Sequence, residues 1–164
     1  MSICLQAMMA AALFGSMSHA QPITLDDLAG TDNYALRLQS GTGYLGASGD
    51  FDGDGSRDIA RFEREGDTVY LVVHAPGDGS GRRHILRDFL VDDMDLYGVE
   101  AAPAGTYATS CERGSGDRGL SCLIDKVAVT TDALQFITFD KSVRLFYWDR
   151  GGFSSVYISE GPGL

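Results

Sequence analysis

Short runs of alternating or β-branched apolar residues, separated by turns rich in glycine and aspartate, make up most of the chain after residue 30. Runs of this length and period favour strands, because an amphipathic helix needs a longer pattern that repeats every 3.6 residues. The clearest case is TVYLVVHA at Thr68 to Ala75, which follows DIARFER at Asp58 to Arg64. Between them Glu65-Gly66-Asp67 predicts a hairpin turn. The remaining predicted strands are Tyr34–Gln39, Arg83–Arg87, Tyr97–Ala101, Gly105–Ser110, Ser121–Thr130, Ala133–Phe139, Ser142–Trp148 and Gly152–Ser159.

Strands at this spacing predict a mainly β domain, either a β-sandwich or a curved antiparallel sheet. The last three strands are joined by tight turns and should form an antiparallel meander. One short N-terminal helix is predicted at Thr24 to Leu28, with Thr24 as its N-cap. Residues 88 to 96 fit either a loop or one helical turn. The chain contains no internal repeat and is too short for the four blades of a propeller.

The first twenty residues carry no Lys, Arg, Asp or Glu and include the apolar run AMMAAALF at positions 7 to 14. The segment ends in Ser18-His19-Ala20, a small-residue pattern suited to cleavage after Ala20. Residues 1–20 therefore resemble a secretory signal peptide, too short to span a bilayer. The alternative is a short N-terminal core helix. With the signal removed, residues 21–164 form one predicted domain, periplasmic or secreted.

The net charge of the chain indicates which kinds of partner it can bind, and its cysteines indicate the cellular compartment in which it folds. Thirteen basic and twenty-three acidic side chains give a net charge of −10, which disfavours nucleic acid. An acidic surface suits cations or a basic envelope protein. Cys111 and Cys122 remain after signal cleavage, and in an oxidising compartment such a pair predicts one disulfide. Closing so short a loop would stabilise the fold by about 3 kcal/mol in the chain-entropy model.

One motif carries recognisable chemistry, GDFDGDGSRDI at residues 49 to 59. Its carboxylates follow the pattern D-x-D-x-D-G-x-x-D, and alternate residues of a curled loop point inward. Calcium is a hard cation that takes six to eight oxygen ligands. Four carboxylates this close repel one another unless a cation lies between them. The predicted calcium ligands are Asp50, Asp52, Asp54, the Ser56 carbonyl and Asp58.

The first half of this motif is similar to an EF-hand loop, but Arg61 stands where an EF-hand needs its bidentate Glu, and the flanks are strand-like. The segment instead resembles the calcium-binding hairpin of FG-GAP repeats, found in integrin α-chains and in bacterial VCBS-type proteins. Phe51 and Ile59 match that family's apolar positions. The resemblance implies one calcium ion held between two β-strands by the five ligands named above. It covers a single copy of the loop and its flanks, so no propeller and no adhesive activity is inferred.

These features predict an exported, non-catalytic calcium-binding domain with a structural or recognition role in the cell envelope. The histidines that follow the predicted signal, His74 and His84, lie in no pattern typical of a catalytic triad. Trp148 borders a turn and is a candidate recognition residue. The alternative function is a periplasmic inhibitor or immunity protein that blocks a basic wall-degrading enzyme.

Overall fold

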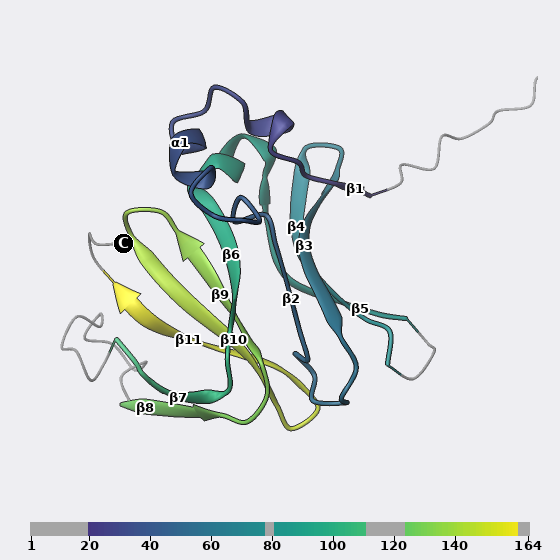
Figure 1. Ribbon diagram of the computed structural model, residues 1–164, viewed down its shortest axis with the longest axis vertical. Helices are drawn as coiled ribbons and strands as arrows, with labels where there is room; N and C mark the ends of the chain where they lie inside the picture. Colours follow the sequence, from purple (N-terminus) through teal and green to yellow (C-terminus); the bar gives the residue numbers. More distant parts are fainter. Residues whose placement is uncertain (1–19, 78–80, 111–123, 161–164) are drawn as a thin grey trace, which may run out of the picture.

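The computed structural model describes residues 20–77, 81–110 and 124–160 (Figure 1). The predicted signal peptide, apart from Ala20, and the predicted Cys111–Cys122 disulfide lie outside these ranges. The elements in chain order are β1 (Gln21–Pro22), the 3-10 helix η1 (Asp26–Leu28), α1 (Tyr34–Arg37), β2 (Gly46–Gly49), β3 (Asp58–Glu65), β4 (Thr68–Ala75), β5 (Arg82–Leu90), the 3-10 helix η2 (Val91–Leu96), β6 (Tyr97–Ala102), β7 (Gly105–Ala108), β8 (Lys126–Val129), β9 (Ala133–Thr138), β10 (Ser142–Asp149) and β11 (Gly152–Glu160).

The strands form antiparallel sheets, which confirms the prediction of a mainly β fold. One sheet has the order β1-β3-β4-β5, with β2 also paired to β3. A second sheet has the order β11-β10-β9-β6, and β7 pairs with β8 alone. The predicted C-terminal meander is therefore present as β9-β10-β11. Within the described ranges the sheets form neither a closed barrel nor a propeller.

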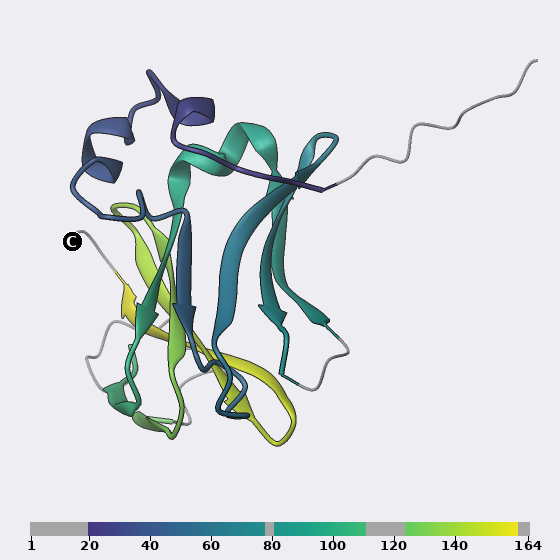
Figure 2. The same cartoon turned by 45° about the vertical axis from the view of Figure 1, so that its right-hand side comes forward.

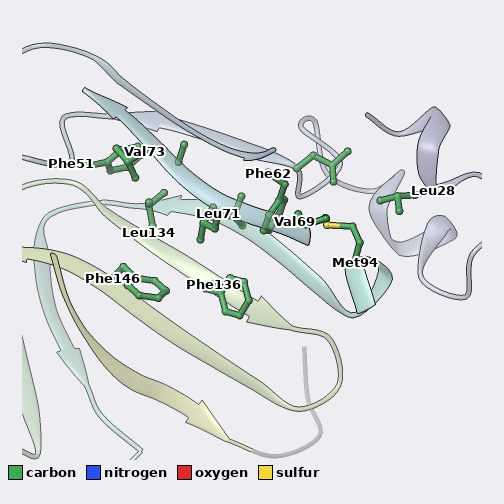
Figure 3. Packing of buried hydrophobic residues seen from close by; sticks show 13 residues of the cluster. Leu28, Phe51, Phe62, Val69, Leu71, Val73, Met94, Leu134, Phe136 and Phe146 are labelled. Carbon is green, nitrogen blue, oxygen red and sulfur yellow. The ribbon is translucent and has the colours of Figure 1, made fainter. Parts of the chain in front are cut away.

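The two larger sheets pack face to face around a shared apolar core (Figure 3). On β3, Ala60 and Phe62 point inward and are fully buried, while Ile59 on the other face is half exposed. Buried and exposed side chains alternate because successive residues of a strand point to opposite faces of the sheet, as the period-two pattern of the sequence predicts. Each large side chain buried in this way contributes about 1.5–3 kcal/mol. The inward residues of the two sheets include Ala60, Phe62, Val69, Leu71, Val73, Val99, Leu134, Phe136 and Phe146.

The hairpin turns follow the local sequence. Glu65 pairs with Thr68, so the predicted turn at Glu65-Gly66-Asp67 is confirmed, and Gly66 has a positive φ of 62°. Between β10 and β11, Arg150 and Gly151 both have positive φ, as a type I′ turn requires. This turn and the β2–β3 loop lie at the end of the sandwich opposite α1 (Figures 1 and 2).

The predicted strand at Tyr34–Gln39 is wrong, because Tyr34–Arg37 forms the helix α1. The apolar alternation misleads here, since Leu38 is 59% exposed. The helix is instead fixed by Arg37, which is fully buried and donates hydrogen bonds to the carbonyls of Gly43, Met94, Asp95 and Tyr97. A buried guanidinium with these acceptors holds α1 against η2 in place of an apolar contact.

Three smaller differences from the predicted elements concern the N-terminal helix, residues 88 to 96 and one additional strand. The N-terminal helix is a single 3-10 turn whose N-cap is Leu25, and Thr24 instead donates from its amide and hydroxyl to Asp27. Residues 88 to 96 divide between the end of β5 and η2. The strand β2 was not predicted, because GASG has no apolar signal.

Within the three described ranges, no helix combines the length and apolar character needed to cross a membrane.

Candidate metal centre

The β2–β3 loop contains the D-x-D-x-D-G-x-x-D motif. Gly49 pairs with Asp58, so residues 50 to 57 join two antiparallel strands. Phe51 is fully buried in the main core and anchors the loop to the sandwich. Gly53 and Gly55 have φ of +76° and +85°, a region in which side chains with a Cβ are strained. The glycines and the phenylalanine thus curl the loop back over the sheet end.

All four aspartates of the motif use one carboxylate oxygen to accept backbone N–H groups of the loop itself. Such bonds set the orientation of each carboxylate and are stronger than neutral hydrogen bonds. The pairs are Gly55 N–Asp50 Oδ2 (3.1 Å), Asp54 N–Asp52 Oδ1 (3.1 Å), Ser56 N–Asp54 Oδ1 (2.7 Å), Phe51 N–Asp58 Oδ2 (2.8 Å) and Asp52 N–Asp58 Oδ2 (3.2 Å).

The second oxygen of each carboxylate is left for another partner. Asp50 Oδ1 and Asp58 Oδ1 are buried and have no hydrogen-bond partner among the described residues. Asp50, Asp52 and Asp58 each offer an oxygen, and these oxygens lie within 4.8 Å of one another. Asp58 is fully buried. Buried carboxylate oxygens without partners are costly, so this arrangement is suited to a cation.

Two of the five predicted ligands lie outside this group of three. Asp54 is exposed, and its Oδ2 lies against Gly77, where an added Cβ would overlap it. Ser56 lines a polar hollow of about 310 Å³ beside the loop, together with Asp50 and Asp132. The structure therefore brings Asp50, Asp52 and Asp58 together and holds Asp54 at the edge of the cluster.

The local electrostatics also favour a cation. Burial raises the pKa of Asp58 above its ordinary value, and the charges of Asp52 and Asp54 raise it further. The N–H groups of Phe51 and Asp52 oppose this shift without cancelling it. A carboxylate that is buried beside two others is unstable as an anion, and a divalent ion would relieve that cost directly.

Two residues that contact the cluster were not predicted from the sequence. Asp132 accepts a hydrogen bond from Asp50 N at 3.0 Å, and its own N–H donates to the Asp50 carbonyl at 3.2 Å. Arg82, the first residue of β5, lies 3.3 Å from Asp52 Oδ2. In the sequence, Asp132 is 82 residues from Asp50, and Arg82 is 30 residues from Asp52. No motif links positions so far apart.

The histidines and Trp148 have neighbours of other kinds. His74 Nε2 lies 2.7 Å from Glu63 Oε1 on the outer face of the first sheet. Trp148 is half-buried, and its ring packs edge-on at 5.6 Å from His84 and 5.0 Å from Phe153. Trp148 is therefore part of an aromatic cluster, and its role in recognition stays a prediction.

Comparison of the chain with models of known protein families, with curated proteins and with solved structures finds no match in any of the three. The feature of this chain that points to a function is therefore the geometry of the β2–β3 loop.

Proposed function

We propose that this chain is an exported, non-catalytic calcium-binding β-domain in which the ion stabilises the β2–β3 loop. The observation that carries the proposal is how the four carboxylates are bound. Each uses one oxygen to accept loop N–H groups and leaves its second oxygen without a loop amide partner. In Asp50 and Asp58 that second oxygen is buried without a partner among the described residues. The loop also joins two antiparallel strands, as the FG-GAP resemblance implies.

Calcium fits this loop better than magnesium for a geometric reason. Magnesium requires near-ideal octahedral ligands at 2.0–2.1 Å and releases its water reluctantly, whereas calcium accepts six to eight oxygens at 2.3–2.6 Å. A curled loop with three converging carboxylates can add the Asp54 carboxylate, the Ser56 carbonyl and water as further oxygens. We expect weak magnesium binding and selective calcium binding.

The proposed role of the ion is structural. Phe51 connects the loop to the core, and Asp132 connects it to the segment that precedes β9. Free energy from ion binding would therefore stabilise both sheets as well as the loop. At an ion concentration 100 times the dissociation constant, the gain is about 2.7 kcal/mol.

The test is calcium titration by isothermal calorimetry of residues 21–164 after treatment with chelator, with magnesium as the comparison ion. Asp50→Asn removes one charge from the cluster and should weaken calcium binding at least about tenfold. Asp140→Asn is the matched control, because Asp140 is exposed in the β9–β10 turn, where its positive φ of 57° suits Asn. Absence of calcium binding to the unmodified domain would overturn the proposal.

A further inference from the structure

Two of the four carboxylates that should face the ion lie beside Gly77, just after β4, and Arg82, at the start of β5. Asp52 Oδ2, the oxygen not bound to a loop amide, lies 3.3 Å from the Arg82 guanidinium. Asp54 Oδ2, also not bound to a loop amide, lies against the backbone of Gly77. Gly77 follows β4 and Arg82 begins β5, so the two contacting residues lie at the same end of one strand pair.

The Arg82–Asp52 pair differs from an ordinary surface ion pair. The Asp52 side chain is only 1% exposed, whereas that of Arg82 is 41% exposed. The oxygen that meets Arg82 is the one that corresponds to the unpartnered oxygens of Asp50 and Asp58. The adjacent Arg83 pairs with Glu63 and Glu65 instead. Arg82 thus supplies positive charge at the position where the cluster would otherwise need it from an ion.

We propose that Arg82 is an internal competitor of calcium, which neutralises Asp52 in the calcium-free protein and is displaced when the ion binds. This inference rests on the proposed calcium site and adds its regulation. A guanidinium and a divalent cation cannot share Asp52 Oδ2 without repulsion. Ion binding therefore releases Arg82 from Asp52 and draws Asp54 away from Gly77. The calcium concentration at which this happens is set by Arg82.

The experiment compares calcium affinity in the unmodified domain, Arg82→Gln, Arg82→Lys and Arg83→Gln, by calorimetric titration with calcium chloride. Removing one charge beside a divalent ion in a water-like medium changes affinity about tenfold, so Arg82→Gln should bind about tenfold more tightly. Arg82→Lys retains the charge and should remain within about threefold of the unmodified domain. Arg83→Gln makes the same charge change one residue away and should also remain within about threefold.

A second readout separates competition from a merely structural role. In excess chelator, Arg82→Gln should lower the unfolding temperature, because Asp52 loses its partner, and saturating calcium should abolish the difference. In an amide NMR spectrum, calcium should shift the Gly77 and Arg82 signals of the unmodified domain.

The outcomes distinguish the two proposals. Calcium binding by the unmodified domain with no gain, or a loss, in Arg82→Gln overturns the role of Arg82 and leaves the calcium site intact. Binding by neither protein overturns both proposals.

Discussion

Replacing Asp58 with Asn should make the calcium-free protein more stable while abolishing its response to calcium. Asp58 is fully buried, and its carboxylate lies within 4.8 Å of those of Asp50 and Asp52. Two unit charges at that separation repel by about 0.9 kcal/mol at an effective dielectric constant of about 80 and by about 3.5 kcal/mol at about 20. The Asn side-chain oxygen can still accept from Phe51 N and Asp52 N, although bonds to a neutral acceptor are weaker. We expect a net gain of about 1–2 kcal/mol in the free energy of unfolding.

The measurement is urea unfolding of the unmodified domain and Asp58→Asn at neutral pH, each with excess chelator and with millimolar calcium. The variant should be the more stable protein in chelator and the less stable one in saturating calcium. Such a reversal is the signature of a residue kept for binding at a cost in stability. The reasoning is refuted if Asp58→Asn is destabilised in chelator, because repulsion would then not dominate this site.

The pH dependence of the same pair gives an independent check. The folded-state pKa of Asp58 is raised above its ordinary value of 3.8, so the native state binds more protons than the unfolded state above that pH. Stability in chelator should consequently fall as pH rises from about 3.8 through the raised pKa. Asp58→Asn should lack this component, so the difference between the two proteins should shrink on acidification.

Three further predictions concern the surroundings of the loop. Phe51→Ala should lower the free energy of unfolding by about 3–5 kcal/mol and weaken calcium binding, as urea unfolding and calorimetry would show. Burial raises the pKa of Glu63, but hydrogen bonds from His74 and two arginines outweigh it and hold the pKa below its ordinary value. Glu63→Gln should therefore cost about 1–3 kcal/mol at neutral pH, because the arginines and histidine that it leaves are partly exposed, and it should remove stability that is lost in the unmodified domain as pH falls from about 4.5 through the lowered pKa, measured by acid titration. Asp132→Ala should cost about 1–3 kcal/mol in urea and weaken calcium binding, because the Asp50 N–H loses its acceptor.

Strand-rich architecture could be predicted from the sequence because the relevant signal is local. At β3 and β4 the apolar residues alternate, and the turn between them contains Gly66. Inward positions such as Ala60, Phe62, Val69, Leu71 and Val73 carry apolar side chains. In α1 the same kind of alternation misled. There the conformation depends on Asp95, which accepts hydrogen bonds from Thr31 and Asn33 more than sixty residues earlier. No window of sequence contains that contact.

Predictability of the candidate site divides in the same way. Asp50, Asp52 and Asp58 lie in one nine-residue segment, so spacing alone could place their carboxylates together. Arg82 and Asp132 reach the cluster only because the start of β5 and the segment before β9 lie beside the loop in the folded protein. Gly49 is a further position whose requirement could not be predicted from the sequence. An added Cβ there would meet Asp132 and Phe51, and these contacts exist only in the folded protein.

These contacts explain how a single loop could serve a whole domain. An acidic turn on a free hairpin would bind an ion with a purely local effect, because little else would change when the ion left. Here Phe51 is fixed in the core, Asp132 joins the loop to the second sheet, and Arg82 joins it to β5. The repulsion among the four carboxylates therefore destabilises three parts of the sandwich, and neutralising these carboxylates would stabilise the same three parts. An ion that replaces Arg82 would strengthen the first two connections while releasing the third, so that calcium would both stabilise the core and alter the surface at one end of the molecule.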